Sequence, residues 1–190
     1  MIKQRDITEV TNGMGLLING DVYLIVDFNH VKPAKGSAFV RIKMKSMKND
    51  SVLERTYRSA ERLEEAVLEF RRLQYLYKDG DGYHFMDQTS FEEAVVPSEM
   101  LGRGVDYLQD NIEAQGVFNG EKLLKVDIPN FIIATIIEAD LGLKGDSSRA
   151  GTKPAKIDTG ATVQVPLFIE VGEVVKIDTR DGTYVERAKK

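Results

Sequence analysis

The chain has 190 residues, of which 42% are hydrophobic and 29% are charged, and its net charge is −4. This balance indicates a folded chain, and no apolar run approaches the roughly 20 residues that span a bilayer. The absence of cysteine excludes disulfides, a thiolate nucleophile and cysteine-ligated zinc. Residues 1–10 lack the apolar core of a signal peptide, so we expect a cytoplasmic protein that has no membrane partner.

Charge is distributed unevenly along the chain. The net charge is +3 for residues 1–64, −7 for residues 65–127 and zero for residues 128–190. A basic first third beside an acidic middle third indicates that only some faces meet phosphate. Such a protein would bind a preformed surface rather than coat arbitrary RNA by counterion release.

Residues 1–64 predict about five short strands joined by tight turns, which is typical of a small β-barrel. Asn12-Gly13 and residues 19–21 have the composition of hairpin turns. Between two of the strands lies a loop that its own sequence makes stiff and short.

In this loop Pro33 fixes φ and favours an extended Lys32, while Gly36 permits reversal of the backbone. Lys35 therefore lies at or next to the tip, where a long cation pointing away from its own domain can reach a partner. Composition alone favours the simpler interpretation, a solvated lysine in a surface turn.

The strand after the loop, residues 39–45, alternates apolar and basic side chains. One face is expected in the core, and the other carries Arg41, Lys43 and Lys45. Judged alone, this basic face is as typical of solvated surface as of RNA contact.

The middle third predicts a second small barrel. Residues 59–65 lack a strand pattern and mark a boundary, after which residues 66–70, 71–77 and 83–86 read as strands with a turn at residues 79–82. A short helix follows over residues 99–108.

Ser98 is placed to cap this helix, although Gly102 and Gly104 weaken it. A third unit begins near residue 128. Its strand-forming runs and turns favour an oligonucleotide-binding (OB) type of barrel. The runs and the polar loop between them occupy residues 131–137, 142–153, 162–169, 174–178 and 184–187.

Three segments resemble signature regions of the bacterial elongation factor P family. Residues 32–39 match its lysine loop, and residues 177–187 match its C-terminal ending. Residues 153–172 match its spaced pattern of Lys, Ala, Gly, an aliphatic residue, Val-Pro, an aliphatic residue and Gly. The resemblance extends over essentially the whole chain.

The resemblance implies an all-β fold of three small β-barrels in an L-shaped, tRNA-like arrangement. An SH3/KOW-like barrel with the lysine loop is expected over residues 1–64. OB-fold domains are expected over residues 65–127 and 128–190.

The resemblance also implies a non-enzymatic translation factor, for which no cofactor and no metal are expected.

 

In this family the protein binds the 70S ribosome between the P and E sites, stimulates peptide-bond formation and relieves stalling at consecutive prolines. Proline is a ring-constrained secondary amine and a poorly oriented partner, so holding the peptidyl-tRNA in place lowers the entropic part of the barrier. The implied partners are the ribosome, the P-site peptidyl-tRNA and the E-site mRNA codon, and the factor is expected to act as a monomer.

The resemblance also assigns residue roles. Lys35 is expected to reach the peptidyl-transferase centre, and in many members a lysine-modifying enzyme extends this side chain. The loop residues expected next to that centre are Lys32, Pro33, Ala34 and Gly36. The expected RNA-binding residues are Arg41, Lys43, Lys45, Gly145, Asp146, Ser147, Lys153, Tyr184 and Arg187.

The sequence departs from the family pattern in two places. Ala34 stands where the family usually has glycine, so a positive φ there would be strained. Ser147 stands where threonine is usual, and it keeps the hydroxyl group.

Two other functions are considered. A generic OB-fold module for single-stranded nucleic acid would stack bases on exposed aromatic rings, although packing in a β core fits the same spacing and is favoured. The candidate rings are Phe39, Tyr75, Tyr77, Tyr83 and Phe85. An enzyme is not expected, because the chain has two histidines, no cysteine and no phosphate-binding glycine loop.

Overall fold

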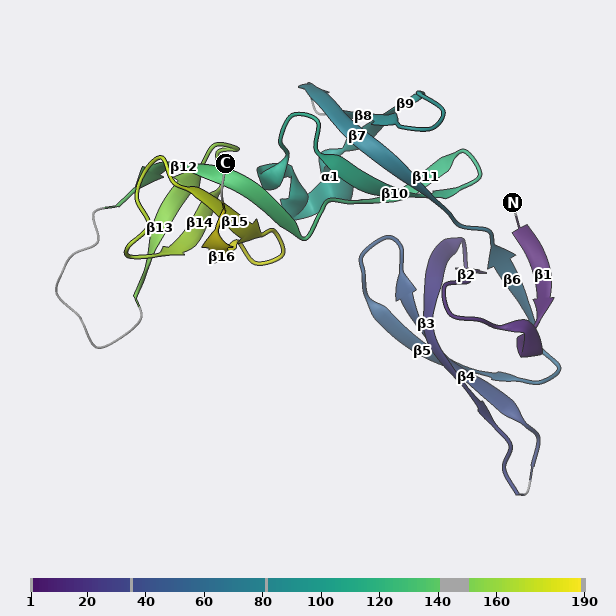
Figure 1. Ribbon diagram of the computed structural model, residues 1–190. Helices are drawn as coiled ribbons and strands as arrows, with labels where there is room; N and C mark the ends of the chain where they lie inside the picture. Colours follow the sequence, from purple (N-terminus) through teal and green to yellow (C-terminus); the bar gives the residue numbers. More distant parts are fainter. Residues whose placement is uncertain (1, 35, 81, 141–150, 189–190) are drawn as a thin grey trace. The chain divides into compact units, whose positions relative to one another are not determined.

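The structure is a computed structural model that describes residues 2–34, 36–80, 82–140 and 151–188. Nearly every regular element in it is a β-strand, and the strands form three sheets (Figure 1). The predicted all-β fold class is therefore confirmed.

The first sheet has the strand order β1-β6-β2-β3-β4-β5. Its strands are β1 (Ile2–Asp6), β2 (Gly15–Ile18), β3 (Asp21–Val31), β4 (Phe39–Ser46), β5 (Val52–Arg58) and β6 (Arg62–Ala66). The second sheet has the order β11-β10-β7-β8-β9. Its strands are β7 (Glu69–Asp79), β8 (Gly82–Asp87), β9 (Glu93–Pro97), β10 (Glu113–Asn119) and β11 (Lys122–Asp127).

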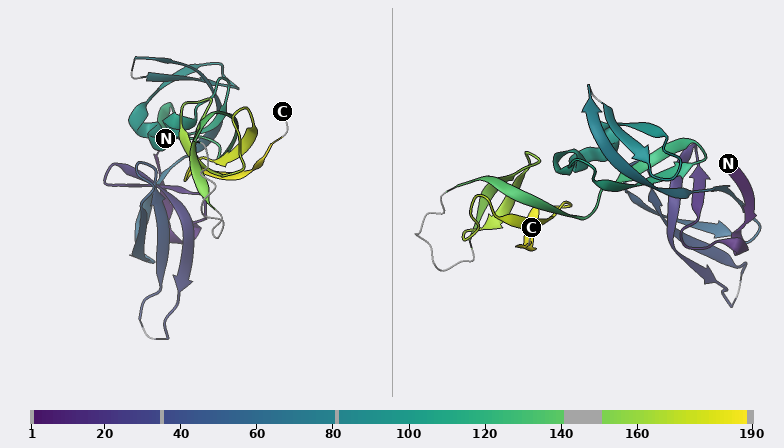
Figure 2. Two further views of the ribbon diagram at one scale, coloured as in Figure 1. Left: turned by 90° about the vertical axis from the view of Figure 1, so that its left-hand side faces the viewer. Right: turned by 45° about the horizontal axis from the view of Figure 1, so that its top comes forward.

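The third sheet closes into a barrel in the order β12-β13-β14-β16-β15, of which Figure 2 gives two further views. Its strands are β12 (Phe131–Ala139), β13 (Thr152–Ile157), β14 (Thr162–Pro166), β15 (Val174–Asp178) and β16 (Thr183–Arg187). A parallel pairing of β14 with β16, at Gln164 and Thr183, completes the ring of strands. Short helical segments are η1 (Ile7–Glu9), α1 (Ser98–Leu101) and η2 (Gly102–Tyr107).

The alternation predicted for the strand after the lysine loop is confirmed. In β4 the side chains of Val40, Ile42 and Met44 are buried in the core of the first sheet. Arg41 and Lys43, between them, are exposed. Successive side chains of a strand point to opposite faces, so the apolar face fixes the direction of the basic one.

The prediction of a strand-free boundary at residues 59–65 is wrong, because residues 62–66 form β6. Only Leu63 and Ala66 of this strand are buried, so its local apolar pattern is weak. Pairing with β1 on one side and with β2 on the other holds it in the sheet. A Cβ on Gly15 would lie 2.3 Å from the Ala66 carbonyl oxygen, so glycine permits this close approach.

The aromatic side chains of the second sheet lie mostly in its core, as favoured above. Tyr75, Tyr83 and Phe85 are 9%, 6% and 0% exposed. Tyr77 is 48% exposed, because a bulge between Tyr75 and Tyr77 shifts the register against β8 and breaks the alternation.

The helix of the structure is shorter than the predicted one and begins at a different residue. Pro97 holds the N-cap position without a side-chain hydrogen bond, and Ser98 is already the first residue of α1, so the predicted Ser98 cap is wrong. Gly102 has a φ of 53° and ends α1 after one turn. The chain continues as the 3-10 segment η2.

Contacts between Cα atoms divide the chain into two compact units, residues 1–71 with 116–126, and residues 72–115 with 127–190. In the second unit, Tyr107 of η2 is 2% exposed and packs into the core of the closed barrel. Thr159 donates a hydrogen bond of 2.7 Å from its hydroxyl to the Asp106 carbonyl. The helical insertion is therefore anchored to the barrel.

Candidate functional site

The predicted lysine loop lies at the end of the hairpin formed by β3 and β4 (Figure 1). The last cross-strand pair before the loop is Val31 with Phe39. Lys32, Pro33 and Ala34 are exposed on one side of the loop and Gly36 on the other, while Lys35 lies outside the described residues. The flanks of the predicted functional lysine are thus presented to solvent by two long paired strands.

The φ angles in this loop show whether Ala34, which replaces the glycine usual in the family, is strained. Gly36 has a φ of 110°, which is accessible to glycine and rarely to other residues. Among the described residues, positive φ without glycine occurs at Asn19, Asp50, Phe91 and Asn111. Ala34 is not in this set, so the strain anticipated at position 34 does not arise in this conformation.

Ser59 fixes the base of the loop from the neighbouring strand. Its hydroxyl donates a hydrogen bond of 2.8 Å to the Ala38 carbonyl, and its backbone amide donates one of 3.3 Å to the same oxygen. Ser59 follows β5 directly, so the edge strand of the sheet supports the start of β4. Its role was missed in the sequence because nothing local to residue 59 identifies its cross-strand partner.

The three cations predicted on the face of β4 lie beside acidic side chains of neighbouring strands. Arg41 forms an ion pair of 3.3 Å with Glu54. Lys43 stands in register between Asp27 of β3 and Glu54 of β5. Part of the positive charge of this face is therefore offset within the sheet itself.

Lys45, the third of these cations, forms an ion pair of 2.9 Å with Asp50, which also pairs with Lys125 at 2.6 Å. Partial burial acts to raise the pKa of Asp50, but the hydrogen bonds and charges of Lys125 and Lys45 outweigh it, so its pKa is lowered. Lys45 is thus held by a carboxylate at the turn between β4 and β5.

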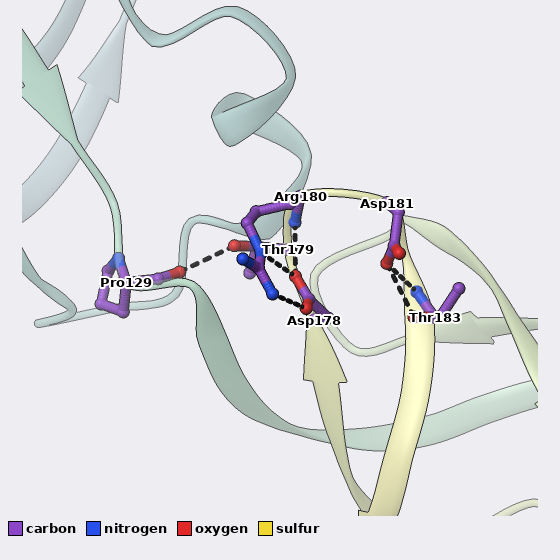
Figure 3. Close-up of polar contacts among 6 residues, drawn as sticks. All are labelled: Pro129, Asp178, Thr179, Arg180, Asp181 and Thr183. Atoms are coloured by element: carbon purple, nitrogen blue, oxygen red, sulfur yellow. Dashed lines mark hydrogen bonds and ion pairs between the residues drawn. The ribbon is translucent and has the colours of Figure 1, made fainter.

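The turn between β15 and β16 contains a compact ion pair (Figure 3). The Arg180 side chain donates hydrogen bonds of 2.9 Å from Nε and 2.5 Å from a terminal nitrogen to the two carboxylate oxygens of Asp178. Its backbone amide donates a third bond, of 3.0 Å. The side-chain and backbone hydrogen bonds from Arg180 lower the pKa of Asp178 to about 2.

The same turn is tied to the segment that precedes β12 (Figure 3). The Thr179 hydroxyl donates a hydrogen bond of 2.8 Å to the Pro129 carbonyl, and its backbone amide donates one of 2.9 Å to the Asn130 carbonyl. Asp178 and Thr179 are 8% and 6% exposed. Asp178 and Thr179, within the C-terminal ending that resembles the family, therefore stabilise the barrel and have little surface left for a partner.

The predicted RNA-binding residues of the last unit are dispersed. Arg187 is exposed, lies over the Phe168 ring at 5.0 Å and pairs with Glu173 at 3.0 Å. Tyr184 is half-buried against the barrel core. Gly145, Asp146 and Ser147 lie outside the described residues.

Lys153 is placed differently from the expectation for an RNA contact. It lies within β13 and is only 8% exposed. A side chain with so little accessible surface offers a phosphate almost no room, so this part of the predicted RNA site is at odds with the structure.

Nothing in the described residues favours the generic module for single-stranded nucleic acid or an enzyme. Three of the five rings proposed as stacking platforms are buried, and Phe39 is half-buried. In the part of the chain that the structure describes, no group of acidic, histidine or cysteine side chains is arranged to hold a metal ion. No helix there is long and apolar enough to cross a bilayer.

Comparison with known proteins covers nearly the whole chain. Residues 6–63 match the family model "Elongation factor P (EF-P) KOW-like domain", residues 68–126 match "Elongation factor P (EF-P) OB domain", and residues 132–187 match "Elongation factor P, C-terminal". A solved structure of "Eukaryotic translation initiation factor 5A from Methanococcus jannaschii" is similar in fold, with a TM-score of 0.51 and 22% identity. It covers 67% of this chain and 92% of its own.

Two relatives make the relationship specific. Elongation factor P of Rippkaea orientalis is 49% identical over 92% of this chain and 95% of its own length. Elongation factor P of Moorella thermoacetica is 48% identical over 93% of this chain and 95% of its own length. The resemblance inferred from the three sequence segments is confirmed, and the chain belongs to the elongation factor P family.

Proposed function

We propose that this translation elongation factor binds the ribosome between the P and E sites and stimulates peptide-bond formation, relieving stalling at consecutive prolines. Its partners in this proposal are the 70S ribosome, the P-site peptidyl-tRNA and the E-site mRNA codon. Lys35, with or without an extension added by a modifying enzyme, reaches the peptidyl-transferase centre.

The observation that carries the proposal is the hairpin of β3 and β4. It consists of strands of 11 and 8 residues that present an exposed loop with Lys32, Pro33, Ala34 and Gly36. A paired hairpin is stiffer than a single loop, and Ser59 bonds to Ala38 at its base. This construction suits a side chain that must be held in place at a distance from its own core.

The proposed effect requires no covalent chemistry by the protein. A peptidyl-tRNA that is held in a reactive orientation has less translational and rotational freedom to lose on reaching the transition state. The benefit is expected to be largest for proline, whose constrained ring orients poorly without help.

Three domains belong to the same proposal, with boundaries at residues 1–64, 65–127 and 128–190. Contacts to RNA are proposed for the remaining residues of the predicted set, without the buried Lys153. These residues are Arg41, Lys43, Lys45, Gly145, Asp146, Ser147, Tyr184 and Arg187.

A reconstituted translation system with a Pro-Pro-Pro reporter and a matched reporter without prolines tests the function. The protein should accelerate synthesis of the first reporter and leave the second unchanged. Lys35→Ala should remove most of the acceleration, while the matched control Lys48→Ala, at the exposed turn after β4, should retain it. Equal rescue by Lys35→Ala and the parent protein would overturn the role of Lys35, and no rescue by the parent would overturn the function.

A further inference from the structure

The turn between β4 and β5 is joined to a strand of another sheet. By strand pairing β11 belongs to the second sheet, but residues 116–126 fall with residues 1–71 in the first compact unit. Within this unit the Lys125 ammonium of β11 lies 2.6 Å from a carboxylate oxygen of Asp50, in the turn. The first sheet and the hairpin of β10 and β11 are therefore linked at this point by opposite charges.

A second cation holds the same carboxylate from within the first sheet. The Lys45 ammonium lies 2.9 Å from the Asp50 oxygen that Lys125 also contacts. The side chain of Lys125 is only 15% exposed, so its charge is partly withdrawn from water and gains more from a neighbouring carboxylate than an exposed lysine would. Exposed ion pairs contribute little because solvent screens them, but a carboxylate shared with a partly buried cation is a better-defined contact.

The turn that carries Asp50 is held by its own hydrogen bonds. The Ser46 amide donates a bond of 2.8 Å to the Ser51 carbonyl, and the Asp50 amide donates one of 3.1 Å to the Ser46 carbonyl. The side-chain oxygen of Asn49 accepts bonds from the amide and the hydroxyl of Ser51. Asp50 has a φ of 58°, a conformation that aspartate and asparagine adopt more readily than most other residues. The Asp50 carboxylate is thus fixed relative to β4.

β4 connects this turn directly to the lysine loop. The turn follows Ser46 and the loop precedes Phe39, at the two ends of the strand. β4 is paired with β3 on one side and with β5 on the other, so it cannot bend alone. A strand of 8 residues spans about 26 Å, so a rotation of about 5° at the turn displaces the loop by roughly 2 Å.

Such a displacement matters for a group that must reach a reacting centre, because a misplacement of about 1 Å can cost on the order of 100-fold in rate. We propose that Asp50 is a positioning residue, which bridges Lys45 and Lys125 and so fixes the direction in which β4 presents the lysine loop. The proposal rests on the proposed function, because it takes this loop as the part that reaches the peptidyl-transferase centre.

The same three groups also have a simpler use. An ion pair between two packed segments can add a little stability and nothing else. The two roles differ in what the loss of the Asp50 charge changes. A positioning role changes the direction of the loop and the rate at saturating protein, whereas a purely stabilising role changes only the free energy of unfolding.

The test uses the full-length protein with Asp50→Asn, Lys125→Met and both together. Asparagine keeps the shape and the backbone conformation of residue 50, and methionine keeps an unbranched apolar stem at residue 125. The matched control is Asp21→Asn, which removes the same charge from an exposed position at the start of β3. Titration of each variant in the Pro-Pro-Pro assay gives the rate at saturating protein and the half-saturating concentration, and chemical denaturation gives the stability.

The direction of the loop is measured in the free protein. The chain has no cysteine, so Asn29→Cys and Glu121→Cys together carry two spin labels at exposed positions, one in β3 and one in the turn between β10 and β11. Electron resonance then gives the distribution of distances between the labels in the parent and in each variant. This distribution should be equally narrow in the parent and in Asp21→Asn, and it should broaden in Asp50→Asn and in Lys125→Met.

Asp50→Asn and Lys125→Met should each lower the rate at saturation on the order of tenfold, with a half-saturating concentration within about twofold of that of the parent. The double variant should be no slower than either single variant, because both changes remove one contact. An unchanged distance distribution, an unchanged saturating rate, or a loss of rate that only follows the fraction of unfolded protein overturns the positioning role and leaves the proposed function standing. If the parent itself does not accelerate the reporter, the proposed function falls and the positioning role falls with it.

Discussion

A side chain at position 182 would collide with Tyr107. A Cβ built on Gly182 would lie 2.8 Å from the Tyr107 hydroxyl oxygen. Gly182 lies in the turn that joins β15 to β16, and Tyr107 belongs to the helical insertion of the second sheet. The glycine thus serves the packing of the insertion against the barrel as well as the turn itself.

Gly182→Ala should therefore destabilise the protein for two reasons. Its φ of 74° is unfavourable for alanine, at roughly 1–2 kcal/mol, and the clash adds about 1–3 kcal/mol. Gly172→Ala is the control, because Gly172 has a φ of 90° but no atom within 4 Å of the added Cβ. Chemical denaturation of both variants measures the difference, and equal costs would contradict the packing role. Tyr107→Phe should reduce the cost of Gly182→Ala, since it removes the contacted hydroxyl.

The ion pair of Asp178 and Arg180 predicts a pH dependence of stability at acid pH. The pKa of Asp178 is lowered from 3.8 to about 2 by hydrogen bonds from Arg180, so the folded state favours the carboxylate. Its contribution is fully present above pH 3.8 and is lost as the pH falls through about 2.

Thermal unfolding of the parent and of Asp178→Asn at constant ionic strength checks this prediction. The difference in Tm should be constant from neutral pH down to the ordinary pKa of aspartate and should shrink below it. A difference that does not vary with pH would show that the ion pair adds nothing beyond the hydrogen bonds that asparagine keeps.

Replacing Arg41, Lys43 and Lys45 together with glutamine should weaken ribosome binding and flatten its salt dependence. The salt slope should fall by less than the value of about 3 expected for three full phosphate contacts, because Glu54 and Asp50 already engage two of the cations. Affinities at several salt concentrations measure the slope. A decrease of about 3 would show that each cation leaves its acid neighbour for a phosphate, and no decrease would show a face that is merely solvated.

The double change Asp146→Ala with Ser147→Ala should leave thermal stability nearly unchanged and shorten the residence time on stalled ribosomes. The segment from Gly145 to Lys153 has no large apolar side chain, and its amides and hydroxyls suit contact with the E-site codon. The control Asp140→Ala with Ser148→Ala makes the same chemical changes outside the proposed contact. Equal residence times for the double variant and the parent would reduce the loop to a linker.

Much of the fold could be predicted from local patterns. The alternation in β4 and the glycine-containing turns depend on neighbours in the sequence, and both are present as expected. β6 was not predictable in this way, because its segment has only two buried side chains. Its backbone becomes a strand through pairing with β1 and β2. The exposure of Tyr77 was likewise hidden, since it follows from a bulge against β8.

The candidate site was predictable as a set of residues but not as a distribution of charge. The sequence places Arg41 and Lys43 on one face, but only cross-strand register places Glu54 beside them. The same register places Arg55 and Arg58 on opposite faces of β5. Such partners lie on separate strands, and no spacing within one strand reveals them.

The register of the hairpin limits how its length can evolve. Along β3, β4 and β5 the cross-strand pairs alternate between core and solvent, so one residue inserted or deleted within β4 would turn Ile42 outward and its charged neighbours inward. The loop begins after the last pair, Val31 with Phe39, and its length is not coupled to that alternation. Over evolutionary time, insertions and deletions should accumulate in the loop and be removed from β4, so a lineage can alter the reach of its lysine without altering the core.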